Sequence, residues 1–98
     1  MKHISTYQIH DTFIITGRGI VLTGRILDGS IFSTNDILEF EFKGQILKRK
    51  ISWIDNGMRV ENGKPNIGIM IETENEDEIS ELRNWSPKLT IGKIYSNG

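Results

Sequence analysis

The sequence predicts an all-β fold, namely a small barrel or sandwich of six or seven short strands. Three observations support this prediction. The 98-residue chain contains seventeen isoleucines, which fit a pleated sheet, and no alanine, the best helix former. Ten glycines supply residues for turns and bulges. Apolar residues recur at alternate positions in short runs that turn residues separate.

The first half of the chain is predicted to form strands over residues 7–16, 20–27 and 37–42. The 7–16 segment, as one strand or two short ones, places polar residues between apolar ones. Residues 17–19 interrupt it, and Asp28-Gly29 is a turn signal after the apolar, β-branched 20–27 run. The 37–42 run alternates strictly, which indicates a half-buried strand.

The second half is predicted to contain strands over residues 45–54, 66–73 and 89–95 and one short helix or turn near 76–84. Lys43-Gly44 and residues 55–57 are turn signals, and 58–65 is predicted to be a loop. Leu47, Ile51 and Trp53 are in apolar phase along 45–54, whereas Arg49 breaks that phase. The break predicts a strand end or a barrel mouth at Arg49.

The composition of the chain limits the classes of function that we expect. Residues 1–98 are predicted to form a single domain with a net charge of −1, from 12 basic and 13 acidic residues, so no strong charge indicates DNA or membrane binding. Because cysteine is absent and histidine occurs twice, we expect no metal site. No catalytic constellation is recognisable, so we expect no enzymatic activity and no cofactor. Neither a signal peptide nor a membrane span is evident, which predicts a cytoplasmic location.

One stretch carries more information than its periodicity. It reads Phe13-Ile14-Ile15-Thr16-Gly17-Arg18-Gly19-Ile20-Val21-Leu22-Thr23-Gly24-Arg25-Ile26-Leu27-Asp28-Gly29. It resembles the opening of domain 2 of elongation factor Tu and other translational GTPases, Phe-x-Ile-x-Gly-Arg-Gly-x-Val-x-Thr-Gly-Arg-Val-x-x-Gly. Residues 34–40 and 66–71 resemble two further segments of that domain. The resemblance implies a closed antiparallel Greek-key barrel over about residues 7–95.

The same resemblance implies where the chain binds. In the family, the Gly-Arg-Gly loop faces ribosomal RNA, which points to Gly17, Arg18 and Gly19. Asn66 matches an asparagine near the aminoacyl end of transfer RNA, although residues 51–55 lack the Glu and Arg that the family supplies there. The phosphate-binding Gly-x-x-x-x-Gly-Lys-Ser/Thr loop of the GTPase domain is absent from the sequence. We therefore expect no GTP hydrolysis by this chain.

Basic residues supply further candidates for binding. Lys48 and Lys50 share the outward face of the predicted 45–54 strand, where they could contact phosphates or form a solvated face. The complete predicted binding set is Gly17, Arg18, Gly19, Arg25, Lys48, Lys50 and Asn66. Trp53 and Trp85 are expected to pack at the core or its rim.

Two functions remain open at this level. The first is a non-catalytic adaptor that contacts ribosomal RNA, transfer RNA or a protein such as a GTPase in a translation-like setting. The second is a module that binds only proteins, either through the acidic segment, residues 72–81, or around Trp85. That segment carries six acids and no base, so it is either a solubilising surface or a docking surface.

Overall fold

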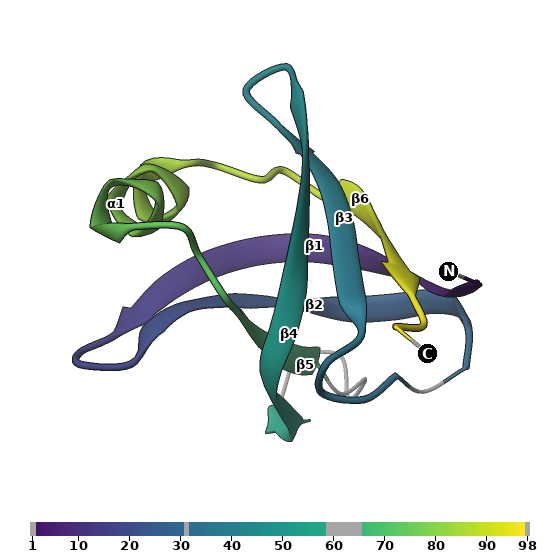
Figure 1. Ribbon diagram of the computed structural model, residues 1–98. Helices are drawn as coiled ribbons and strands as arrows, with labels where there is room; N and C mark the ends of the chain where they lie inside the picture. The colour runs from purple at the N-terminus through teal and green to yellow at the C-terminus, as the bar shows by residue number, and fades with distance from the viewer. Residues whose placement is uncertain (1, 31, 59–65, 98) are drawn as a thin grey trace.

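The computed structural model describes residues 2–30, 32–58 and 66–97 and shows a closed antiparallel barrel of six strands with one helix (Figure 1). The elements are β1 (His3–Ile15), β2 (Gly19–Gly29), β3 (Ile37–Phe42), β4 (Gln45–Met58), β5 (Asn66–Ile71), α1 (Glu76–Asn84) and β6 (Thr90–Tyr95). Around the barrel the order is β1-β2-β5-β4-β3-β6, and β6 closes onto β1. Strands β3, β4 and β5 form a meander with β6 beside β3, which is a Greek key. The predicted all-β barrel is confirmed.

The core is made by the inward residues of all six strands, and Tyr7 ties three of them together. Its side chain is fully buried, and its phenol donates to the carbonyl oxygen of Ile67 at 2.5 Å and to that of Leu22 at 3.3 Å. Burial raises the pKa of Tyr7, so the phenol stays protonated and remains a donor. One side chain thus links β1 to both β2 and β5.

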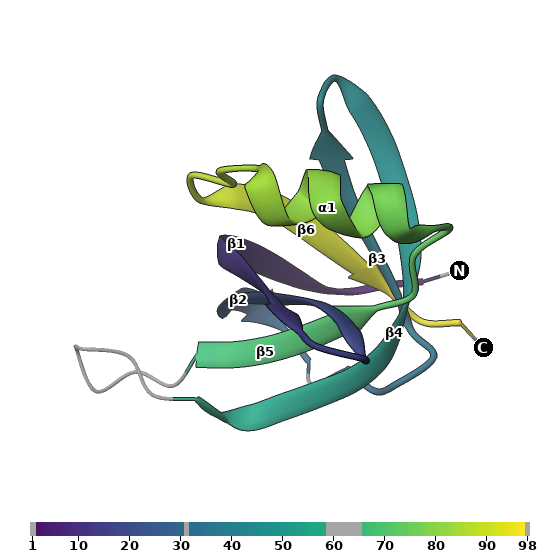
Figure 2. The ribbon, with the colours of Figure 1, turned by 90° about the vertical axis from the view of Figure 1, so that its left-hand side faces the viewer.

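Helix α1 lies across one end of the barrel, as Figure 2 shows. Asn75 caps it by accepting from the backbone N–H of Glu78 at 2.9 Å. Leu82 is fully buried, and its carbonyl oxygen accepts a hydrogen bond from Thr12 Oγ1 of β1 at 3.0 Å. Trp85 follows the helix and packs against Phe40, with ring centroids 5.7 Å apart. The helix therefore seals the mouth of the barrel instead of standing free of it.

Several strand boundaries in the structure differ from the predicted ones. Strand β1 begins at His3, four residues earlier than expected, and β2 runs through the predicted Asp28-Gly29 turn. The turn predicted at residues 55–57 is wrong, because β4 continues to Met58 and stays paired with β5. A register shift between Asp55 and Met58 absorbs one extra residue of β4. Most of the predicted 58–65 loop lies outside the described residues.

Within the described part of the chain, no helix has both the length and the apolar character needed to cross a membrane.

Candidate functional site

The outward face of β4 carries three of the side chains that bear on binding. Leu47 and Ile51 point inward and pack in the core, so the alternating Lys48 and Lys50 point outward. The pairing of β4 with β5 shifts between Ile51 and Trp53, which marks a bulge at Ser52. Because of that bulge, Trp53 joins the two lysines on the outward face.

The orientation of Trp53 follows from its neighbours on β5. Trp53 pairs with Met70, whereas the next pair along, Ile54 and Ile69, faces the core. Consecutive residues of a strand point to opposite faces, so Trp53 lies outside the barrel. It is half-buried there, so the predicted inward phase of Trp53 is wrong, because the bulge at Ser52 turns its side chain outward. Trp85 packs over Phe40 at the barrel mouth, as expected for a residue at the core or its rim.

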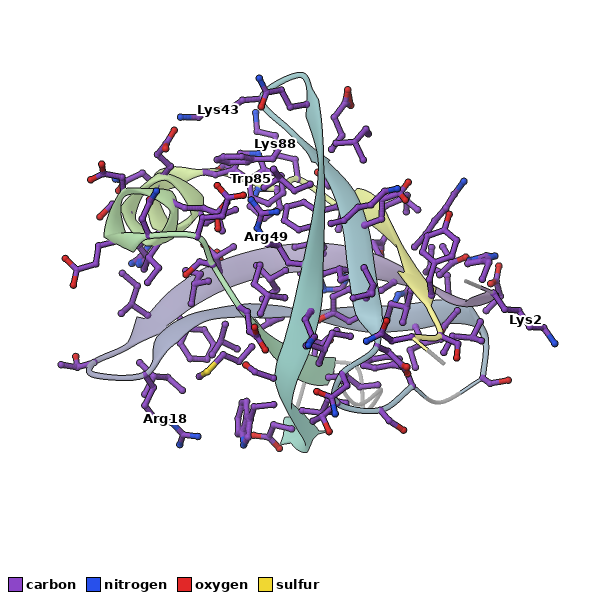
Figure 3. All side chains as sticks on the ribbon, viewed as in Figure 1. Lys2, Arg18, Lys43, Arg49, Trp85 and Lys88 are labelled. Atoms are coloured by element: carbon purple, nitrogen blue, oxygen red, sulfur yellow. The ribbon has the colours of Figure 1, made fainter. Side chains whose placement is uncertain are left out.

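Arg18 occupies the exposed turn between β1 and β2 (Figure 3), and its guanidinium lies over the ring of Trp53. Gly17 and Gly19 have φ angles of +78° and +140°, which a side chain would strain, so these glycines set the turn. The guanidinium carbon lies 5.7 Å from the centroid of the Trp53 ring, within cation–π range. Among the described residues, no carboxylate forms an ion pair with Arg18. We call Arg18, Lys48, Lys50 and Trp53 the β4 strip.

The two lysines of the β4 strip differ in their surroundings. Lys48 Nζ lies 3.9 Å from Glu39 across the β3–β4 pair, and its side chain is 59% exposed. A surface pair at that distance is loose and contributes little. Lys50 is opposite the apolar Ile37, and no carboxylate in the described ranges pairs with it. Within the described ranges, the β4 strip therefore keeps two cations that form no ion pair, Arg18 at the exposed turn and Lys50 on the strand.

Arg25 and Asn66 lie together but apart from the β4 strip. The β2–β5 register ends at Gly24 opposite Ile67, so Arg25 and Asn66 are the next residues on the two strands. Arg25 Nε and Asn66 Oδ1 are buried, and neither has a hydrogen-bond partner among the described residues. Asn66 lies four residues from Met70, the neighbour of Trp53, which is about 13 Å along a strand. The predicted binding set thus divides into two groups.

Arg49 enters the mouth of the barrel and holds helix α1. Its guanidinium donates through Nε to both carboxylate oxygens of Glu78, at 3.1 and 3.2 Å, and through Nη2 to the same group. Glu74 lies 3.7 Å from Arg49. The hydrogen bond from Arg49 lowers the pKa of Glu78, and the same bond raises the pKa of Arg49. The break in apolar phase at Arg49 is therefore explained by this ion pair.

The acidic segment, residues 72–81, is partly neutralised inside the chain. Glu74 and Glu78 pair with Arg49, and Glu81 pairs with Lys43 at 3.2 Å. Three of its six acids thus fasten the segment to β4 and to the β3–β4 turn. The sequence alone shows only a run of negative charge, because the cations that pair with it lie far away along the chain.

Comparison with known proteins identifies no relative, since no family model, no curated protein and no solved structure matches the chain. In the described part of the chain, no three His, Asp or Glu side chains gather in a way that could hold a metal ion.

Proposed function

We propose that the chain is a non-catalytic, cytoplasmic binding module of the elongation factor Tu domain 2 type, which contacts RNA through the β4 strip. The observation that carries the proposal is the position of Arg18, which lies over the Trp53 ring at an exposed turn and forms no ion pair with any described residue. Phosphate contacts from Arg and Lys supply most of the affinity in such interfaces.

The geometry of the β4 strip suits a phosphate backbone. A guanidinium presents a planar fork of donors that matches two phosphate oxygens, and packing on Trp53 restricts its motion before it binds. Lys48 and Lys50 are two residues apart on one face, which places their Cα atoms about 7 Å apart. A strand of RNA that follows β4 would therefore meet successive cations.

The test is the affinity of purified protein for a fluorescently labelled ten-nucleotide single-stranded RNA, measured by anisotropy. We expect Arg18→Ala and Lys50→Ala each to weaken binding about 3- to 10-fold, and to a similar extent for every RNA sequence. Lys2→Ala is the matched control, because Lys2 is exposed and lies on the opposite side of the molecule from Arg18 (Figure 3). Unchanged affinity in both strip variants would contradict the proposal.

A second candidate is a module that binds only proteins through the acidic segment. It is favoured by Glu72, Glu76 and Asp77, which are exposed and form no ion pair with any described residue. Capture of partners from a cell lysate with and without ribonuclease separates the two candidates. Loss of the captured material after ribonuclease supports RNA binding. A protein that is retained after ribonuclease, and lost in a Glu72→Gln/Asp77→Asn variant, supports the second candidate.

A further inference from the structure

Strand β4 has an open edge where the β3–β4 hairpin stands out from the barrel (Figure 1). The pairing of β4 with β5 ends at Ile51, opposite Ile71. One further bond follows, in which the backbone N–H of Glu72 donates to the carbonyl oxygen of Lys50 at 2.9 Å. The chain then leaves the sheet for α1, so the part of β4 before Lys50 pairs, among the described residues, with β3 alone.

The register of the hairpin shows which backbone groups lie along this open edge. Residues 43–44 form a two-residue turn with positive φ angles of 51° and 78°. The residues that flank such a turn are a hydrogen-bonded pair, and every second residue after them bonds to the partner strand. Ile46 and Lys48 fall between those positions, so their backbone groups point away from β3. Lys50 uses the same direction for its bond to the segment that follows β5.

Three backbone groups of the open edge have no hydrogen-bond partner among the described residues. They are the N–H and the carbonyl oxygen of Ile46 and the N–H of Lys48. The carbonyl oxygen of Lys48 accepts from Arg49 Nη1 at 3.0 Å and is satisfied. The side chain of Ile46 is 58% exposed, so an apolar surface accompanies the unpaired groups. Such an edge is a template for pairing with a strand of another chain.

A cleft of about 650 Å³ lies between the open edge and helix α1, and its charge selects the partner. The acidic segment contributes four acids to its lining, and two cations face them, which leaves an excess of two negative charges: Glu74, Asp77, Glu78 and Glu81 against Lys43 and Arg49. Asp77 is exposed and forms no ion pair within the described ranges. A second copy of the chain would bring the same acidic wall to this edge, so like charges would meet. The cleft therefore favours a partner strand that carries basic side chains.

We propose that the open edge of β4 binds an extended segment of a partner protein as an added strand, with lysine or arginine side chains facing α1. Successive side chains of a strand point to opposite faces of the sheet. Those on the face of Arg49 enter the cleft and meet the acids, and those on the other face lie beside Ile46 and are apolar. Main-chain hydrogen bonds supply affinity, and the alternation supplies specificity. The interaction is independent of RNA binding, since it uses backbone groups of β4 and acids of α1.

The test uses two eight-residue peptides with capped ends, one of alternating lysine and valine and one of alternating glutamate and valine. We expect the lysine peptide to bind the intact chain about 10-fold more tightly than the glutamate peptide. Bound lysine peptide should slow amide hydrogen exchange at Ile46 and Lys48 by about 10-fold or more. Exchange at Glu41, on the other strand of the hairpin, should stay unchanged.

Two substitutions at one position separate the backbone of the edge from its side chain. Ile46→Pro removes the unpaired N–H but no bond to β3, and proline is tolerated where the N–H of an edge strand faces solvent. It should weaken binding of the lysine peptide by about 10-fold or more, whereas Ile46→Thr, the matched control, should retain it. Asp77→Asn should weaken binding about 2- to 5-fold. Circular dichroism checks that Ile46→Pro folds, and the exchange measurement on wild type does not depend on that variant.

The outcomes distinguish this proposal from the proposed function. Failure of the lysine peptide to bind, or equal affinity for the two peptides, overturns the basic partner strand. Equal affinity of folded Ile46→Pro and Ile46→Thr for the lysine peptide also overturns it. Dimerisation of the chain that Ile46→Pro abolishes would overturn it in favour of a second copy at this edge. Each of these results leaves RNA binding by the β4 strip intact, and loss of RNA binding leaves the strand site intact.

Discussion

Replacing Gly24 by alanine is expected to cost the barrel about 3 kcal/mol or more of its free energy of unfolding. Gly24 lies in β2, opposite Ile9 of β1. A Cβ atom there would lie 1.9 Å from the carbonyl oxygen of Gln8 and 3.1 Å from Cζ of Tyr7. The first of these is a backbone atom of the paired strand, so relief of the clash requires β1 and β2 to separate.

Gly44→Ala is the matched control for this change. Gly44 has a φ angle of +78°, and a Cβ atom there would meet nothing within 4 Å. Alanine at this position therefore suffers only the left-handed backbone conformation, which costs about 1–2 kcal/mol. Urea unfolding followed by circular dichroism measures both variants. If Gly24→Ala is no less stable than Gly44→Ala, the close approach of β1 to β2 described above is incorrect.

Replacing Arg49 by methionine is expected to have the second largest effect, a loss of about 2 kcal/mol of stability. The change leaves the Glu78 carboxylate, which is 12% exposed, without its hydrogen-bonded cation at the barrel mouth. The loss is smaller than for a fully buried pair because water still reaches the mouth. Lys43→Met is the control: it removes the exposed Lys43–Glu81 pair, so it should cost less than about 0.5 kcal/mol. Equal losses for both variants would show that the Arg49 pair does not hold α1.

The Arg49–Glu78 pair also predicts how stability depends on pH. The pKa of Glu78 is lower in the folded state than its ordinary value of 4.5, chiefly because Arg49 donates to its carboxylate. The contribution of the pair is therefore fully present above pH 4.5 and is lost as pH falls through the depressed folded pKa. Urea midpoints measured from neutral pH downward should fall more steeply for wild type than for Glu78→Gln. Parallel curves would contradict this assignment.

Local sequence predicts those elements whose patterns depend on near neighbours. The 37–42 strand and the 76–84 helix have the same bounds in the structure, since strict alternation defines the first and an Asn cap defines the start of the second. Arg49 is the clearest case of a long-range feature that leaves a local trace. Its charge in an inward phase indicates a barrel mouth before any partner is known.

Other features depend on contacts that the sequence pattern does not contain. Residues 55–57 look like a turn, yet pairing with β5 keeps β4 extended through them. The bulge at Ser52 places Trp53 on the outer face, and without it the alternation would point Trp53 inward. The contact between Arg18 and Trp53 joins a turn to a distant strand, so neither residue predicts the other. Arg18 and Trp53 therefore come together only when the strands of the barrel are assembled.

The salt dependence of RNA affinity tests the central claim most directly. The account predicts that the intact chain binds a ten-nucleotide single-stranded RNA at about 50 mM salt and that log affinity falls linearly with log salt concentration. Three phosphate contacts, from Arg18, Lys48 and Lys50, predict a slope of about −2, and Lys50→Ala should make it shallower by about 0.7. Absence of saturable binding at low salt, or an affinity that does not change with salt, would contradict the account.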